Sequence, residues 1–246
     1  MRDPSPLLKW DSRVLLRING RTHSPWTSIF RAFSFLGREP IWLGVIAWYL
    51  FIYYQVELFV HFGLILLYGL IIVAVLKNIT RRPRPSAVLH QVKVLDGPNQ
   101  SYSFPSWHSY NIMAISLSIA YFTNSSLVLV IGLIISGIVA YSRVCLGVHY
   151  PSDVIVGVTC GVPGFFLARG TMPWWVEIVH FFEQFTDFPI NEGWNHLLQC
   201  WWYWMVIVGV YGGIFLSSIF PLLSRSKNVA VPAPQPHSEG SRNGTL

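Results

Sequence analysis

The feature that most constrains the fold of this chain is a series of apolar stretches separated by short polar segments. Six stretches have the composition of membrane-spanning helices: Ile41–Tyr54, Leu58–Leu76, Ile112–Phe122, Leu127–Ala140, Val154–Leu167 and Trp201–Phe220. A helix needs about 20 residues to cross a bilayer, so we expect each of them to extend into its polar flanks. Backbone groups inside a bilayer find no water, which favours helices. The sequence therefore predicts an all-α fold, a polytopic membrane helical bundle of about six transmembrane helices.

The charge content supports this class. Only 11% of the residues are charged, against about 25% in an ordinary soluble domain. Lys and Arg number 17 against 11 Asp and Glu, a balance that suits anionic lipid headgroups or a phosphate site. The apolar spans leave no soluble domain to read nucleic acid. We therefore expect the lipid bilayer and a lipid phosphate as partners and no nucleic acid, while the oligomeric state stays open.

The chain divides into three parts by composition. Residues 1–38 have apolar residues at helical spacing interrupted by arginines, which predicts N-terminal interfacial amphipathic helices with breaks at Asn19-Gly20 and Ser24-Pro25. Residues 39–222 form the predicted transmembrane domain. Residues 223–246 are rich in Pro, Ser, Gly and Asn, which predicts a disordered polar tail. We expect a multi-pass protein of the cell inner or plasma membrane, with an endomembrane as the alternative.

The segment Ser142–Asp153 (S-R-V-C-L-G-V-H-Y-P-S-D) carries the strongest chemical signal. His149 and Asp153 are four residues apart, so a helix beginning near Pro151 brings the carboxylate under the imidazole ring. A carboxylate that accepts the Nδ1 proton leaves Nε2 free as a base or nucleophile. Arg143 adds a permanent charge that matches phosphate oxygens.

Two further motifs precede this segment, Lys77–Pro85 (K-N-I-T-R-R-P-R-P) and Pro105–His108 (P-S-W-H). In this order the three resemble the type 2 phosphatidic acid phosphatase family, which includes the vanadium haloperoxidases and has the pattern K-x6-R-P, P-S-G-H and S-R-x5-H-x3-D. The first and third motifs match at every defining position. The second departs at Trp107, where the family usually has glycine. A helical conformation there keeps the backbone N–H available and lets the indole point outward into the interface or line a lipid channel.

The residues and the resemblance imply the same two-step hydrolysis of a phosphate ester or anhydride. His149 attacks phosphorus to form a phosphohistidine, His108 donates a proton to the leaving oxygen and then activates water, and Asp153 orients His149. The expected phosphate-binding groups are cationic side chains, a hydroxyl and backbone N–H groups at a helix start: Lys77, Arg84, Arg143, Ser106 and Trp107. We expect no metal and no cofactor, because fixed cations take the place of metal ions. Arg81 and Arg82 are interpreted as a positive-inside cluster.

The predicted spans place all three motifs on one side of the membrane, at the ends of the second and fourth spans and the starts of the third and fifth. A site at this rim suits a membrane lipid phosphatase, with polyprenyl diphosphate as the favoured substrate and phosphatidic acid or phosphatidylglycerol phosphate as alternatives. A lipid-phosphate binder, a transporter and a phosphotransferase are the other functions considered. Which membrane face carries the site stays open.

Overall fold

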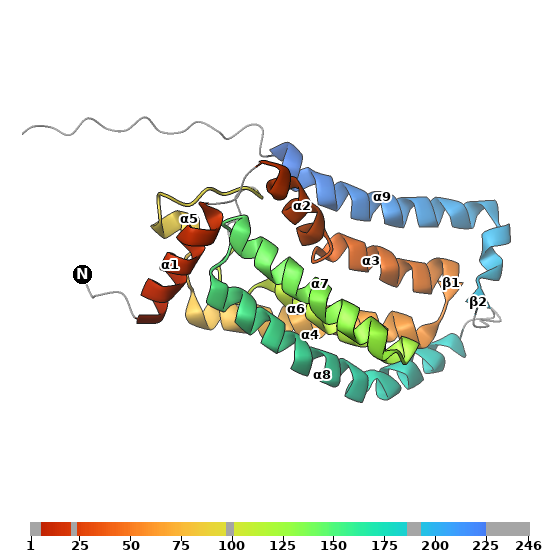
Figure 1. The fold of residues 1–246 in the computed structure, drawn as a ribbon. Helices are drawn as coiled ribbons and strands as arrows, with labels where there is room; N and C mark the ends of the chain where they lie inside the picture. Colours follow the sequence, from red (N-terminus) through yellow and green to blue (C-terminus); the bar gives the residue numbers. More distant parts are fainter. Residues whose placement is uncertain (1–5, 21–23, 97–100, 186–192, 225–246) are drawn as a thin grey trace, which may run out of the picture.

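The protein is a bundle of helices in the computed structural model, which describes residues 6–20, 24–96, 101–185 and 193–224 (Figure 1). The helices are α1 (Pro6–Asn19), α2 (Ser24–Phe35), α3 (Glu39–Ala47), α4 (Val56–Thr80), α5 (Pro85–Val88), α6 (Trp107–Thr123), α7 (Ser126–Cys145), α8 (Pro151–Glu183) and α9 (Trp201–Ser224). A π-helical turn Trp48–Ile52 and a 3-10 turn His196–Gln199 complete them. Two short strands, β1 (Tyr53–Tyr54) and β2 (Gly193–Trp194), pair antiparallel.

The predicted all-α membrane bundle is confirmed. Four helical segments in the described residues are long and apolar enough to cross a membrane: Pro25–Ile52, Val56–Val88, Ser126–Cys145 and Pro151–Glu183. The helices α6, with 17 residues, and α9 also coincide with predicted spans. The second to fifth predicted spans extend into both flanks, and α8 runs on to Glu183, well beyond the predicted end. The first begins earlier than predicted, at Glu39, but its helix ends at Ile52, and the sixth extends only at its C-terminal end. The number of spans stays a prediction, and the predicted disordered tail lies outside the described residues from residue 225 on.

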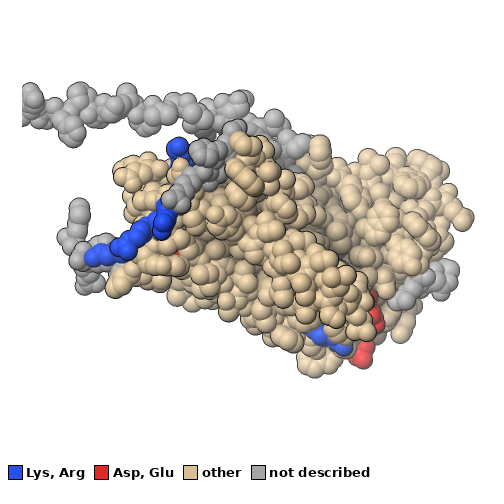
Figure 2. All heavy atoms as spheres, viewed as in Figure 1, with Lys and Arg blue, Asp and Glu red and all other residues tan. Residues whose placement is uncertain are grey.

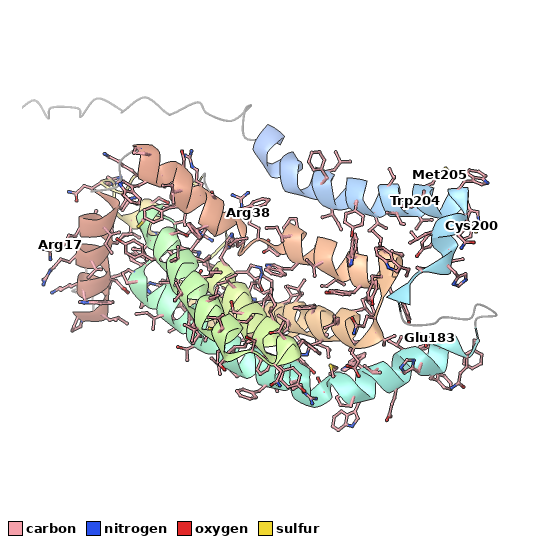
Figure 3. All side chains as sticks on the ribbon, turned by 45° about the vertical axis from the view of Figure 1, so that its right-hand side comes forward. Arg17, Arg38, Glu183, Cys200, Trp204 and Met205 are labelled. Carbon is pink, nitrogen blue, oxygen red and sulfur yellow. The ribbon has the colours of Figure 1, made fainter. Side chains whose placement is uncertain are left out.

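Charged side chains gather at the two ends of the bundle. On the face shown in Figure 2, Lys and Arg cluster where α1 lies, and a wide band without visible charge separates them from the charges at the far end. Arg17 and Glu183 lie towards these two ends (Figure 3). The described N-terminal helices have the predicted breaks, since α1 ends at Asn19 and α2 begins at Ser24. The proposed division of the chain into three parts stays a prediction.

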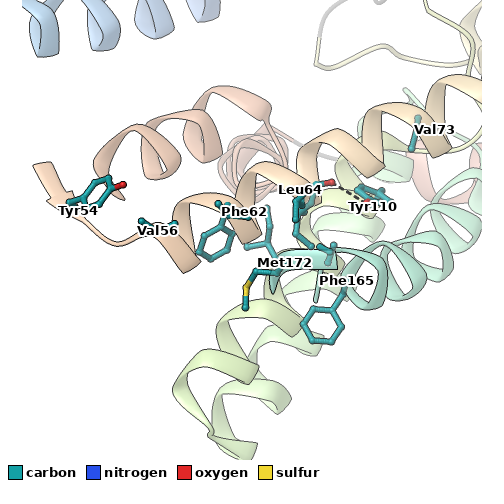
Figure 4. Packing of buried hydrophobic residues seen from close by; sticks show 13 residues of the cluster. Tyr54, Val56, Phe62, Leu64, Val73, Tyr110, Phe165 and Met172 are labelled. Atoms are coloured by element: carbon teal, nitrogen blue, oxygen red, sulfur yellow. Dashed lines mark hydrogen bonds between the residues drawn. The ribbon is translucent and has the colours of Figure 1, made fainter. Parts of the chain in front are cut away.

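The core of the bundle forms where α6 packs against α4, α7 and α8. Tyr110 of α6 is fully buried, and its hydroxyl donates to the Ile65 carbonyl of α4 at 3.1 Å (Figure 4). Glycines on both sides make room for its ring, because a Cβ atom on Gly69 or Gly164 would lie 2.2 Å from Tyr110 atoms. This close packing fixes α6, whose N-terminus carries the second motif.

A second glycine of α8 tests this packing. A Cβ atom on Gly161 would lie 2.8 Å from the Tyr110 carbonyl oxygen and 2.8 Å from Met113 Cβ, where the backbone cannot yield. We expect Gly161→Ala to destabilise the protein by about 1–3 kcal/mol, which lowers the melting temperature in detergent by several degrees. Gly170→Ala on the same helix is the control, because among the described residues no heavy atom outside the local helix backbone lies within 4 Å of a Cβ atom there. Equal melting temperatures for the two variants would contradict this packing.

Candidate active site

A cavity of about 300 Å³ lies where α4 and α7 end and α6 begins. All three motifs contribute polar side chains to its wall: Lys77, Arg84, His108, Arg143 and His149. Leu70, Val73 and Ala74 of α4 form an apolar wall. The convergence of the motifs at one end of the bundle, expected from the order of the spans, is confirmed. A more open hollow of about 800 Å³ elsewhere contains no motif residue.

His149 and Asp153 form the pair that their spacing predicts. Because α8 begins at Pro151, Asp153 lies in its first turn, with Oδ2 3.5 Å from His149 Nδ1. This distance is at the outer limit of a hydrogen bond. The same oxygen accepts from the Tyr150 amide at 2.8 Å and from the Ser103 hydroxyl, so the carboxylate is held in place independently of the ring. Such contacts often tighten when substrate binds.

The ring of His149 is buried, with only 2% of its surface exposed. Burial lowers the pKa of His149 from its usual 6.5 to about 4, although its hydrogen bond to Asp153 acts in the opposite direction. The ring is therefore neutral at pH 7. Its Nε2 lies 3.5 Å from Nη1 of Arg84, so an unprotonated Nε2 faces the cationic side of the cavity.

Arg84 is fixed between two segments that border the cavity. Its Nε donates to the Ser101 carbonyl at 2.8 Å and its Nη2 to the Ser101 hydroxyl at 3.0 Å, while Nη1 donates to the Val148 carbonyl at 2.9 Å. Lys77 donates to the same Ser101 hydroxyl at 3.0 Å. The two cations are thus brought together beside His149.

Arg143 is held by an acid that the motif does not contain. Its Nη1 donates to Asp96 Oδ2 at 2.5 Å and to the Ser34 hydroxyl, and Arg38 binds the other oxygen of Asp96 at 3.0 Å. Arg38 lies between α2 and α3 (Figure 3). Sequence analysis missed the roles of Arg38, Ser34 and Asp96, because nothing in their spacing connects them to Arg143.

The second motif forms the start of α6. The Ser106 hydroxyl caps this helix by accepting from the Ser109 amide at 3.4 Å, and Ser106 is not among the residues that line the cavity. Trp107 is the first helical residue and has no positive φ, so its conformation does not require glycine. Its ring lies in the cavity wall and stacks on Tyr110 with centroids 5.9 Å apart. The phosphate-binding roles of Ser106 and Trp107 stay predictions.

Arg82 is the clearest difference from the sequence analysis. Instead of a free surface charge, its Nη1 donates to Asp153 Oδ1 at 2.7 Å and its Nη2 to Asp11 Oδ2 at 2.6 Å. Its guanidinium also lies over the Tyr150 ring, 4.1 Å from the centroid. The interpretation of Arg82 as part of a positive-inside cluster did not include these contacts, whereas Arg81 is exposed. The sequence feature that could have indicated this contact is Asp11, an acidic residue on the buried face of a helix whose other charged residues are basic.

Apart from His149 Nδ1 beside Asp153, three buried nitrogen atoms of residues that line the cavity have no hydrogen-bond partner among the described residues. They are Trp107 Nε1, His108 Nε2 and Arg143 Nε. Buried polar groups in native proteins are nearly always paired, so such a cluster indicates a site for a polar ligand. Together with Lys77 and Arg84, these groups favour an anion.

The described residues contain no group of three or more His, Cys, Asp or Glu side chains that is able to hold a metal ion. The positive charge around the cavity comes from protein side chains. Arg84 and Arg143 are 8% and 3% exposed, so little water screens them. The cavity wall offers three cations and two histidines, and the Asp153 carboxylate lies beside His149.

Comparison with known proteins places these residues in a family. Over 107 residues the chain is 36% identical to the phosphatidylglycerophosphatase B of Bacillus subtilis (strain 168), which covers 39% of this chain and 49% of that protein. Over 129 residues it is 30% identical to the undecaprenyl-diphosphatase of Sulfolobus acidocaldarius, covering 51% of this chain and 60% of that protein. The matches thus span about half the length of these relatives.

The solved structure of Aquifex aeolicus LpxE has the same fold. Its TM-score is 0.59 at 22% sequence identity, covering 65% of this chain and 95% of that chain. The model of the PAP2 superfamily matches residues 58–177, which contain all three motifs and the helices that carry them. This segment of the chain, which carries the candidate site, belongs to the PAP2 superfamily.

Proposed function

We propose that this protein is a lipid phosphatase that removes a phosphate from a membrane lipid through a phosphohistidine intermediate. The observation that carries the proposal is a set of buried nitrogen atoms that have no hydrogen-bond partner in the part of the chain that the structure describes. These atoms, Trp107 Nε1, His108 Nε2 and Arg143 Nε, belong to residues that line one cavity together with His149. A phosphate group has oxygens to accept from such donors and a charge to match the cations. The apolar wall of α4 suits the tail of a lipid whose phosphate lies at the headgroup level.

In the proposed first step, His149 Nε2 forms a bond to phosphorus while the bond from phosphorus to the leaving oxygen breaks. His108 donates its proton to that oxygen, and Asp153 stabilises the charge that develops on His149. In the second step His108 takes a proton from water, whose oxygen displaces the nitrogen. Phosphate leaves, and His149 returns to its neutral form.

The cations stabilise the charge on the three equatorial oxygens during both steps. Lys77, Arg84 and Arg143 supply this charge from the cavity wall. The backbone N–H groups at the start of α6 add donors, as helix N-termini do for anions. The reaction so described uses no metal ion and no cofactor.

We favour a polyprenyl diphosphate as the substrate. One relative is named for undecaprenyl diphosphate and another for phosphatidylglycerophosphate, so both lipids are reasonable candidates, with phosphatidic acid as a third. The cavity wall has three cations against the single carboxylate of Glu39, a balance that suits the larger charge of a diphosphate.

The test is phosphate release by the purified protein in detergent with EDTA present. We expect release from undecaprenyl diphosphate to exceed release from phosphatidylglycerol phosphate and phosphatidic acid, and we expect vanadate to inhibit it by imitating five-coordinate phosphorus. Binding of these lipids without release would favour a binder or transporter. Release that depends on an added lipid or sugar hydroxyl would favour a phosphotransferase, and loss of activity in EDTA would contradict a metal-free reaction.

A further inference from the structure

The N-terminal helix α1 contributes a buried carboxylate close to the His149–Asp153 pair. Asp11 is completely buried, and its Oδ1 accepts from the Ser152 amide at 2.9 Å. Its Oδ2 accepts from the Ser152 hydroxyl at 2.6 Å and from Arg82 at 2.6 Å. Asp11 lies outside residues 58–177, the segment that matches the family.

Arg82 connects this carboxylate to the candidate catalytic pair. Its Nη2 binds Asp11 while its Nη1 binds Asp153 Oδ1 and the Ser152 hydroxyl, both at 2.7 Å. The other oxygen of Asp153 therefore remains directed at His149. One arginine shared by two carboxylates neutralises Asp153 less than an arginine that binds Asp153 alone.

The position of Asp11 is fixed by the packing of α1. Leu15 is fully buried one turn later. One turn beyond it, the side-chain Nδ2 of Asn19 donates to the Cys145 and Lys93 carbonyls at 2.8 and 2.9 Å. The Lys93 amide donates back to Asn19 at 2.8 Å. Three residues on one face of α1 thus hold it against the ends of α7 and α8.

We propose that Asp11 is a positioning residue for hydrolysis: it holds Arg82 so that Asp153 keeps the charge and orientation needed to direct His149. Asp11 does not line the cavity, so it acts through Arg82 rather than on the lipid phosphate. When Asp11 loses its charge, Arg82 turns fully to Asp153. The carboxylate then supports the charged form of His149 less well, and formation of the phosphoenzyme slows.

The test is a double-mutant cycle on the full chain, and it rests on the proposed phosphatase activity. We expect Asp11→Asn to lower kcat by about 10–100-fold, the scale of losses on mutating outer-shell partners, while KM changes less than about twofold. In an Arg82→Gln background, Asp11→Asn should cost little further, because both substitutions interrupt the same connection. Arg13→Gln, on the exposed face of α1, is the charge control and should leave kcat unchanged.

The outcomes separate this inference from the proposed function. Independent, multiplying effects of the two substitutions on kcat, a change confined to KM, or a lower melting temperature with unchanged kcat would each overturn the role of Asp11. If Asp11→Asn does not fold, Ser152→Ala makes the milder test, since it removes one hydrogen bond from each of Asp11 and Arg82. It should lower kcat about threefold, and an unchanged kcat would overturn the proposal. A wild-type protein that releases no phosphate would instead refute the phosphatase activity itself.

Discussion

Replacing His149 with alanine is expected to lower phosphate release by on the order of 10⁴-fold or more, the scale seen when a nucleophile is removed. The cations of the cavity remain in this variant, so lipid binding should survive while the covalent step is lost. Comparing lipid binding with phosphate release in this variant therefore distinguishes an enzyme from a protein that only binds the lipid. Release is measured with undecaprenyl diphosphate at saturating concentration, and lipid affinity is measured on the same preparation.

His108→Ala gives the complementary result. The variant keeps the nucleophile but lacks the group that activates water, so with a good leaving group we expect a phosphoenzyme to accumulate that His149→Ala never forms. Acid-labile, base-stable protein phosphate, located by mass spectrometry at residue 149, is the measurement. The control is His90→Ala, an exposed histidine two residues beyond the end of α5. Labelling of a residue other than His149 would refute the assigned nucleophile.

Replacing Arg84 with lysine should reduce kcat/KM by about 10²–10³-fold, although the charge is kept. The planar guanidinium reaches Ser101, Val148 and the neighbourhood of His149 Nε2 at once, at 2.8–3.5 Å. A lysine has one nitrogen and cannot form these bonds together. The segments around Ser101 and Val148 then separate, and the phosphate loses a fixed partner.

Arg81→Lys is the matched control for Arg84→Lys. Arg81 lies three residues earlier, is exposed, and its side chain donates only to the Asn78 carbonyl among the described residues, at 3.2 Å. The Arg81→Lys variant should retain the kcat/KM of the wild-type protein. Melting temperatures of both variants establish that they are folded. A loss at Arg84→Lys smaller than tenfold would show that charge alone is sufficient at this position.

The helices were predictable because their signal is local. Apolar runs mark α4, α7 and α8. Capping residues mark the helix ends, as Ser125 does at the start of α7, where its hydroxyl accepts from the Val128 amide. The length of α8 was underestimated, because Pro173 and the charged residues that follow the apolar run ending at Leu167 lie inside the helix. Neighbouring helices and side chains tolerate such breaks in a bundle. The strands β1 and β2 are two residues each, too short to leave a pattern.

The helical membrane fold, the three motifs and the His149–Asp153 pair follow from the sequence, because each depends on apolar runs or on spacing within one turn of a helix. The pairing of particular acids with particular arginines depends on contacts between distant segments. Asp11 meets Ser152 across 141 positions, and Asp96 meets Arg143 across 47. Buried charges must be paired. In the sequence, any acidic residue is an equally suitable partner for a given arginine. Only the folded arrangement of α1, α7 and α8 selects the partner.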